Sequence, residues 1–150
     1  MKVKEIMTRD VVSVSADMSV DEALHLIFKM KISGLPVIDE KNNLIGMFTE
    51  KGILRTILPG YLDKVGGFVY EENPKVIKKK MSELTNMKVS QVMRQEVITV
   101  NEDTTLCEVA RIMLTQHIRR ILVLQSDNKV VGIVAREDVL RAFAKEAGLA

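Results

Sequence analysis

The stretch VVGIVARED, residues 130–138, decides the fold. Its first six residues are apolar or small, which is typical of a buried strand, and Arg136-Glu137-Asp138 then has the composition of a first helical turn. Where a strand passes into a helix, unpaired backbone N–H groups face outward, and a carboxylate there can accept hydrogen bonds from sugar hydroxyls. Asp138 is therefore a candidate nucleotide contact, although a carboxylate at a helix start also stabilises the helix dipole without any ligand.

A second stretch, LIGMFTEKG at residues 44–52, has the same shape. Its glycine, Gly46, lies 132 − 46 = 86 residues before Gly132, and this offset aligns residues 3–55 with residues 89–141 without a gap. A sequence that repeats at one offset over such a length is a tandem repeat. Because a unit of this size is only marginally stable by burial alone, we expect the two repeats to pack as a pair.

The order of elements in each repeat is predicted to be β-α-β-β-α. Residues 11–14 are β-prone, and a helix then begins after a capping residue, Ser19 or Thr105, which a Glu follows three residues later. Two strands joined by a polar turn, and a second helix, complete a layer that needs a partner on its open face. The predicted fold is α/β (α+β), with tandem repeats packed as a pseudo-twofold pair. The helix residues expected to face the core are Val20, Ala23, Leu24 and Ile27, and Leu106, Val109, Ala110 and Met113.

The predicted domains are repeat 1 at residues 1–58, a connector at residues 59–88, and repeat 2 at residues 89–150. The connector contains the breaker pairs Pro59-Gly60, Gly66-Gly67 and Asn73-Pro74, followed by a helical pattern over residues 75–87. Its lysine triplet, residues 78–80, is either a patch for an anionic partner or a solvated helix face, and solubility is the simpler interpretation. Long connectors are often functional or mobile.

The composition argues against several classes of function. The 150 residues are 47% hydrophobic and 28% charged, as in a soluble globular chain, and 22 basic against 20 acidic residues leave a net charge of +2, too small for a dedicated nucleic-acid binder. The single cysteine, Cys107, has no partner for a disulfide, and no metal-ligand spacing, P-loop or pair of nucleophile and base occurs. We expect no enzyme, metal or cofactor, no membrane segment, and a cytoplasmic location.

Taken together, the motifs resemble the CBS domain, named after cystathionine β-synthase, which occurs as tandem pairs called Bateman modules. The resemblance is carried by MTRDV at residues 7–11 and MRQEV at 93–97, by GLPV at 34–37, and by the closing motif Gly-hydrophobic-x-Thr/Ser-x-x-Asp at 46–52 and 132–138. It implies regulatory binding of an adenosine-containing ligand such as AMP, ADP, ATP or S-adenosylmethionine in clefts between the repeats. In that family the motif Asp holds the ribose hydroxyls and the motif Thr or Ser contacts phosphate.

Transferred to this sequence, the two clefts are not equivalent. One keeps the carboxylate, Asp138, but has Ala135 in place of the motif hydroxyl, whereas the other keeps Thr49 but has Gly52 in place of the carboxylate. Losing the carboxylate forfeits charge-assisted hydrogen bonds of about 1.5 to 3 kcal/mol in total, so we expect Asp138 to mark the principal site. The resemblance implies that this site comprises Asp138, Ala135, Ile133, Thr8, Val12, Ile32, Ser33 and Gly34. It lines the opposite cleft with Met47, Ile98, Ile118 and Arg119.

The missing hydroxyl at position 135 leaves two alternatives open. The ligand carries little phosphate, or Arg119 and Arg120 bind the phosphate in place of a hydroxyl, as guanidinium groups can do in bidentate fashion. Both arginines could equally be surface residues of a loop.

Two functions from different classes follow. The first is a sensing module that binds the adenosine ligand and signals to a regulated protein that the sequence does not name. The second is a structural dimerisation scaffold whose clefts have degenerated. In both cases we expect a homodimer, with a contact formed largely by the second helices, which carry Ile53, Leu54 and Ile57, and Val139, Leu140 and Phe143.

Overall fold

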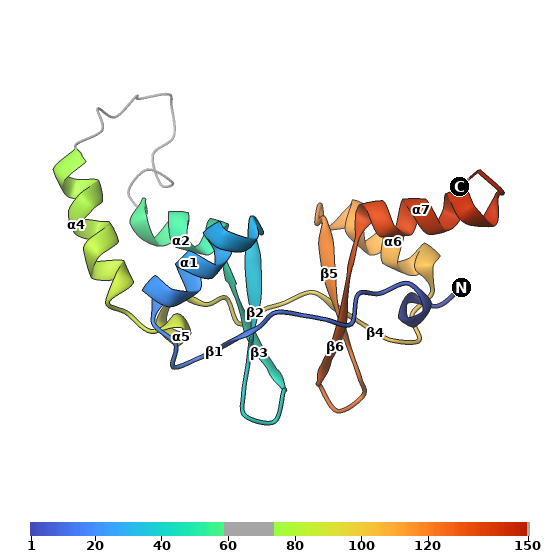
Figure 1. The fold of residues 1–150 in the computed structure, drawn as a ribbon, viewed down its shortest axis with the longest axis horizontal. Helices are drawn as coiled ribbons and strands as arrows, with labels where there is room; N and C mark the ends of the chain where they lie inside the picture. The colour runs from blue at the N-terminus through green and yellow to red at the C-terminus, as the bar shows by residue number, and fades with distance from the viewer. Residues whose placement is uncertain (59–73, 150) are drawn as a thin grey trace. The chain divides into compact units, whose positions relative to one another are not determined.

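The computed structural model of the chain describes residues 1–58 and 74–149, and it has the predicted mixture of helices and short strands (Figure 1). The chain forms two compact units. Unit 1 comprises Met1–Val12, Lys41–Leu44 and Ile98–Ala150, and unit 2 comprises Ser13–Glu40 and Ile45–Val97. Each unit is built around one three-stranded sheet.

Unit 2 contains the sheet β1-β2-β3 and the helices that cover it. The Ser19 side chain accepts a hydrogen bond from the Glu22 backbone N–H at 3.1 Å, so the predicted cap is confirmed. All four predicted residues of the first helix are buried, because their spacing places them on one face. The first strand is shorter than the β-prone segment suggested. The elements are β1 Val14–Ser15, α1 Val20–Met30, β2 Gly34–Ile38, β3 Leu44–Thr49, α2 Glu50–Ile57, α4 Pro74–Thr85 and α5 Val89–Val92.

Unit 1 repeats the plan with the sheet β4-β5-β6. The β4 and β5 strands are parallel, and β5 and β6 form an antiparallel hairpin. Thr105 caps the first helix of this unit by accepting from the Glu108 N–H at 3.3 Å, and three of the four predicted core residues are buried, with Ala110 half-buried. The elements are η1 Val3–Glu5, β4 Thr99–Asn101, α6 Leu106–Thr115, β5 Arg120–Leu124, β6 Val130–Ala135 and α7 Arg136–Glu146.

The two repeats exchange their opening segments. Residues 1–12, from the first repeat, belong to unit 1, where Thr8 and Ile133 exchange two backbone hydrogen bonds of 2.9 Å. Residues 89–97, from the second repeat, belong to unit 2, where Arg94 and Met47 exchange two of 2.8 Å. Each segment thereby covers part of an edge strand, β6 or β3, whose backbone groups would otherwise lack partners. The compact units therefore do not coincide with the sequence repeats.

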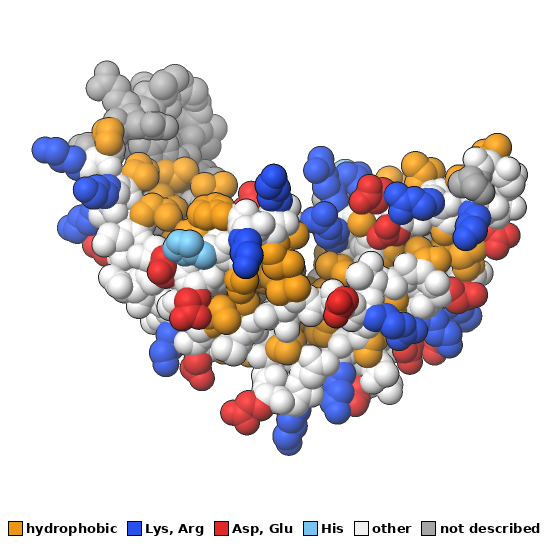
Figure 2. Space-filling view, in the orientation of Figure 1, with side chains coloured by type: hydrophobic (Ala, Val, Ile, Leu, Met, Phe, Trp, Pro, Cys, Tyr) orange, Lys and Arg blue, Asp and Glu red, His pale blue; other side chains and the backbone are white. Residues whose placement is uncertain are grey.

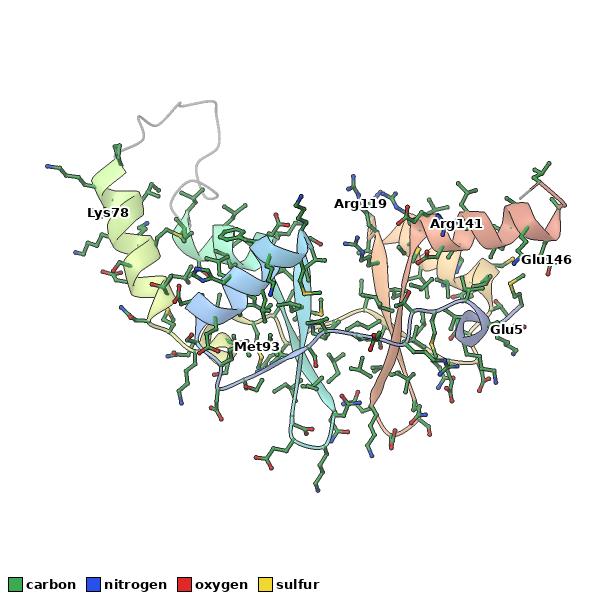
Figure 3. All side chains as sticks on the ribbon, viewed as in Figure 1. Glu5, Lys78, Met93, Arg119, Arg141 and Glu146 are labelled. Carbon is green, nitrogen blue, oxygen red and sulfur yellow. The ribbon has the colours of Figure 1, made fainter. Side chains whose placement is uncertain are left out.

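Glycine is needed where the opening segments cross the strands. A Cβ atom added to Gly132 would lie 2.5 Å from the Met7 sulfur, and one added to Gly46 would lie 2.8 Å from the sulfur of Met93, which Figure 3 labels beside β3. Any larger residue would push the methionine, and the segment that carries it, off the strand. In both cases the methionine of one repeat thus contacts the glycine of the other repeat: Met7 contacts Gly132, and Met93 contacts Gly46.

Helix α4 confirms the helix predicted in the connector. The breaker pairs at residues 59–60 and 66–67, and Asn73, lie outside the described residues. Leu84 is buried in the core of unit 2, and α4 contacts both α1 and α2. Lys78 and Lys79 are exposed, and Figure 3 shows Lys78 pointing away from the unit, which is the solvated face that we expected. Lys80 differs, because its ammonium group donates to the Ile57 carbonyl at 3.0 Å, at the end of α2.

The expected dimer contact needs correction. Ile53, Ile57 and Val139 are buried inside their own units, since they lie on the core face of the second helices, and no partner chain can reach them. Leu54 and Leu140 remain 56% and 69% exposed. Figure 2 shows hydrophobic side chains gathered over the helices of each unit. Within residues 1–58 and 74–149, no helix has the length and apolar character needed to cross a membrane.

Candidate functional site

The junction of β6 and α7 holds the Asp138 carboxylate in one orientation. Ala135 is the N-cap residue of α7, and its backbone N–H donates to Asp138 Oδ2 at 2.9 Å. The other oxygen, Oδ1, lies 3.6 Å from Arg141 Nη1, which is close enough for an ion pair but too long for a hydrogen bond. The Asp138 side chain is 28% exposed. One carboxylate oxygen therefore caps the helix, and the other can accept hydrogen bonds from a ligand.

The junction of β3 and α2 in unit 2 has a capping hydroxyl in place of a capping carboxylate. Thr49 is the N-cap of α2, and its hydroxyl oxygen accepts from the Gly52 backbone N–H at 3.0 Å. A complete capping box combines an N-cap hydroxyl with an acidic or amide side chain at the third helical position. The motif Thr/Ser-x-x-Asp is such a box. In this chain each helix has one of its two capping groups, the hydroxyl at α2 and the carboxylate at α7.

The register of the β5-β6 hairpin separates the two candidate arginines. Arg120 pairs directly with Ala135, so the Arg120 side chain lies on the same face of the sheet as Ala135 and Ile133, opposite the buried Val134. Arg119 precedes the strand, and its carbonyl accepts from the Arg136 N–H at 2.9 Å. Figure 3 shows Arg119 projecting from the end of β5 and Arg141 from α7. Of the two, only Arg120 has its side chain placed by the register beside the missing hydroxyl at position 135.

Thr8 lies on this same face. It forms a hydrogen-bonded antiparallel pair with Ile133, and the side chains of such a pair point to one side of the sheet. The carboxylate half-site, as we call it, comprises Thr8, Arg120, Ile133, Ala135 and Asp138, and it joins the opening segment to the β5-β6 hairpin and the start of α7 in unit 1. Val12 and Ile98 are exposed and Ile118 is half-buried, all in unit 1, whereas the predicted residues Ile32, Ser33 and Gly34 belong to unit 2.

The corresponding positions of unit 2 are also close together. A Cβ atom added to Gly34 would lie 2.9 Å from the Thr49 methyl group, so Gly34 and Thr49 are neighbours across β2 and β3. The Ser33 carbonyl accepts from the Glu50 N–H at 2.9 Å, as Arg119 does from Arg136 in unit 1. The edge of β3 is covered by Arg94, paired with Met47. We call Gly34, Met47, Thr49, Gly52 and Arg94 the hydroxyl half-site.

Each half-site has one arginine and one threonine, but on different segments. In the carboxylate half-site the threonine is on the opening segment and the arginine on β5, whereas in the hydroxyl half-site the arginine is on the opening segment and the threonine ends β3. Across each hairpin a larger residue faces a small one: Arg120 pairs with Ala135, and Thr49 lies beside Gly34. A carboxylate is present only at position 138, since the equivalent residue is Gly52.

Comparison with known proteins decides the family. The model of the CBS domain matches residues 3–59 and residues 89–145, which together are most of the chain. The chain belongs to the CBS domain family. It contains two CBS domains in tandem, as the resemblance of its motifs indicated, and the offset between the matched segments is that of the repeat.

Full-length relatives and solved structures agree with this assignment. The CBS pair is 34% identical over 154 residues to the chloroplastic CBS domain-containing protein CBSX1 of Arabidopsis thaliana, covering 93% of this chain and 63% of CBSX1. It is similar to the crystal structure of CBSX2 in complex with AMP, with 28% identity, a TM-score of 0.73 and coverage of 97% and 98% of the two chains. The CBS domain pair of protein MJ0100, in complex with 5'-methylthioadenosine and S-adenosyl-L-methionine, is similar at 25% identity, a TM-score of 0.67 and coverage of 97% and 98%.

The motif comparison alone did not single out Arg94. The signal was nonetheless present in the sequence of the CBS pair, since the repeat offset aligns Arg94 with Thr8, which we had placed in a cleft. Once the segments are exchanged, Arg94 contacts β3 and lies one residue pair away from the Thr49 motif position.

Proposed function

We propose that this CBS pair is a regulatory module that binds an adenosine-containing ligand and passes the effect of binding to a partner protein. The observation that carries the proposal is the Asp138 carboxylate, which has one oxygen hydrogen-bonded to the Ala135 N–H and the other free of hydrogen bonds from its own helix. An oriented, half-buried acceptor of this kind suits the vicinal hydroxyls of ribose. The similar structures of CBSX2 and MJ0100 contain AMP and S-adenosyl-L-methionine respectively, which supports this ligand class.

The roles within the carboxylate half-site follow from the chemistry of its side chains. Ile133 provides an apolar surface for the flat base, and Thr8 and Val12 lie on the segment that covers the strand. Arg120, beside Ala135, takes the place of the absent hydroxyl as the phosphate contact. Ile32, Ser33 and Gly34 belong to unit 2, and their part in this site stays a prediction from the family resemblance. Arg119 is a secondary phosphate contact.

The arginines bear on which adenosine ligand is preferred. A guanidinium group beside the ribose site attracts phosphate and repels the sulfonium centre of S-adenosylmethionine. We therefore rank AMP, ADP and ATP above S-adenosylmethionine for this chain. The module carries out no catalytic step in this proposal, its location in the cytoplasm remains a prediction, and its regulated partner is defined only as a protein that distinguishes the liganded from the free state.

A test of the proposal is a thermal melting series with AMP, ADP, ATP, S-adenosylmethionine and adenosine. A ligand at a hundred times its dissociation constant should stabilise the native state by about 2.7 kcal/mol, and in Asp138→Ala an affinity that is about tenfold to hundredfold weaker should reduce this stabilisation to about 1.4 to 0.4 kcal/mol. Glu137→Gln is the matched control, because it removes a carboxylate from the adjacent, exposed position. If no adenosine compound shifts the melting temperature of the wild-type protein, the sensing function is excluded.

The second candidate, a dimerisation scaffold, is favoured by one observation. Equivalent residues of the two repeats are exposed apolar side chains, Phe28 and Leu114 on the first helices and Leu54 and Leu140 on the second. Large apolar residues repeated on the surface at the same positions are typical of an interface. We include a homodimer in the proposal, with Leu54, Leu140 and Phe143 at its contact. Light scattering of Leu54→Asp with Leu140→Asp should give the monomer mass, whereas a wild-type monomer at micromolar concentration would contradict the dimer.

A further inference from the structure

Helix α4 belongs to unit 2 and has no counterpart among the described elements of unit 1. In unit 2, α4 contacts both α1 and α2, Leu84 is buried in the core, and Ile77 and Met81 pack against the same core. Lys80 donates to the Ile57 carbonyl at 3.0 Å, so α4 lies against the end of α2. The helices described for unit 1 are η1, α6 and α7 (Figure 1). Because η1 corresponds to α5 by the repeat offset, none of the three takes the place of α4.

Two positions of unit 1 are less buried than their equivalents beside α4. Ile57 is 6% exposed in unit 2, whereas its repeat equivalent, Phe143, is 38% exposed in unit 1. Leu24 is buried, whereas its equivalent, Ala110, is smaller and half-buried. Other equivalent helix residues are buried in both units: Val20 and Leu106, Ala23 and Val109, Ile27 and Met113, and Ile53 and Val139. We call Ala110 and Phe143 the uncovered flank.

The uncovered flank lies between the core side and the outer side of its two helices. An α-helix turns by about 100° per residue, so Phe143 lies about 40° from the buried Val139 and about 60° from the exposed Leu140. Ala110 lies at the same angle from the buried Leu106 on α6. Since α6 and α7 contact each other, as α4 contacts both α1 and α2 in unit 2, a single added helix can cover both positions.

The uncovered flank adjoins the proposed dimer contact, but it has a different occupant. Leu54 is 56% exposed although α4 is present, so a helix in the corresponding place leaves the equivalent Leu140 free for a dimer. A second copy has no helix to offer among its described residues. Leu84 holds α4 in unit 2, and the apolar faces of α1, α2, α6 and α7 are buried in their own units. The helix that covers the flank therefore comes from a different protein.

Helix α4 shows the chemistry that such a helix needs. Its apolar residues Ile77, Met81 and Leu84 recur at i, i+4 and i+7, which places them on one face, while Lys78 and Lys79 are exposed. The matching partner segment is an amphipathic helix of about three turns with large apolar side chains at this spacing. It needs no equivalent of Lys80, because α7 continues to Glu146 and the Phe143 carbonyl accepts from the Ala147 N–H at 3.1 Å.

We propose that the uncovered flank is the docking site for an amphipathic helix of the regulated partner protein. The proposal rests on the sensing function proposed above, which requires such a partner. Helix α7 links the two sites, because it carries Asp138 in its first turn and Phe143 five residues later. A ligand that engages the free oxygen of Asp138 thus acts on the same rigid element that the partner helix contacts.

The experiment uses a synthetic peptide of residues 74–88, with both ends blocked, as the probe. It is titrated into the full chain, and amide NMR spectra follow the binding, since they register the weak affinity expected of a short isolated helix. The resonances of Ala110 and Phe143 should shift until they saturate. Phe143→Ser should weaken binding at least about tenfold. Leu140→Ser is the matched control, since it removes a more exposed apolar residue from the same helix, and it should change the affinity by no more than about twofold.

Several results would overturn the docking site. The first is a peptide that leaves the Ala110 and Phe143 resonances unchanged, or that binds Phe143→Ser as well as wild type. Equal weakening by Leu140→Ser and Phe143→Ser would place the peptide on the outer dimer contact instead. A peptide with serine at positions 77, 81 and 84 should not bind, and its binding would show that the apolar face is not recognised.

AMP separates the docking site from the sensing function. Saturating AMP should change the affinity for the peptide at least about threefold, and an unchanged affinity would overturn the assignment of the flank to the regulated partner. Stabilisation by AMP without peptide binding leaves the sensing function and removes the docking site. Peptide binding without stabilisation by any adenosine compound removes the sensing function and leaves a helix-docking site.

A second variant guards against a folding defect in Phe143→Ser. Ala110→Arg places a long charged side chain on the flank from a half-buried position and should abolish peptide binding, while a cooperative melting transition shows that the protein remains folded. Retained peptide binding in a folded Ala110→Arg protein would also overturn the proposal.

Discussion

Asp138 has two roles that substitutions can separate. Its Oδ2 atom accepts from the Ala135 N–H at 2.9 Å and caps α7, and its Oδ1 atom is proposed to accept from the ligand. Asp138→Ala removes both. Loss of the cap should destabilise the unliganded protein by about 1 kcal/mol, which for a chain of this size lowers the melting temperature by about 2 to 4 °C. Loss of the ribose contact, worth about 1.5 to 3 kcal/mol, should weaken AMP binding about tenfold to hundredfold.

Asp138→Asn separates these effects. The amide oxygen can still accept from the Ala135 N–H, so the unliganded protein should lose less than about half of the stability that Asp138→Ala loses. The amide nitrogen then faces the ligand, and because it cannot accept a hydrogen bond the affinity for AMP should fall as far as in Asp138→Ala. Urea denaturation of the unliganded proteins and calorimetric titration with AMP measure the two quantities independently. Equal destabilisation by the two substitutions would refute the capping role, and unchanged AMP affinity in both would refute the ligand role.

Three further predictions concern the fold around the half-sites. Gly132→Ala should cost about 1 to 3 kcal/mol of unfolding free energy, because its Cβ would lie 2.5 Å from the Met7 sulfur, and it should cost much less in a Met7→Ala background, where the sulfur is gone; full additivity in this double-mutant cycle would contradict the contact. His117 has a left-handed backbone at φ 56°, a conformation that glycine adopts without strain. His117→Gly should therefore raise the unfolding free energy by about 0.5 to 1 kcal/mol, seen as a higher urea midpoint. A lowered midpoint would show that the His117 side chain contributes packing. Lys4 donates to Asp103 at 2.9 Å, and this hydrogen bond lowers the pKa of Asp103 and raises that of Lys4. The pair therefore stabilises the folded protein between the two ordinary pKa values, and this stabilisation is lost as the pH falls through the lowered pKa of Asp103. Asp103→Asn should therefore lose less stability than the wild type between about pH 5 and pH 2. The same dependence of stability on pH in both proteins would show that the pair is not maintained in solution.

The sequence alone was sufficient for the features that depend on neighbouring residues. The caps at Ser19 and Thr105, and the passage from strand to helix at residues 130–138, were predicted correctly because each depends on side chains and backbone groups within one turn of the chain. The spacing of the helix residues likewise determines which side of α1 is buried. The same spacing misled us about the dimer contact, since a residue such as Ile57 fits both a core and an interface until its neighbours are known.

Only the tertiary structure decided which groups meet at the two motif copies. Exchange of the opening segments brings Thr8 to β6 and Arg94 to β3, and no local pattern specifies which edge strand a segment will pair with. The hairpin register sets Arg120 beside Ala135, and one residue of slippage would have sent it to the other face. The repeat therefore determined that there are two copies of one motif, whereas pairing between distant segments determined that one copy presents a carboxylate and the other presents donors.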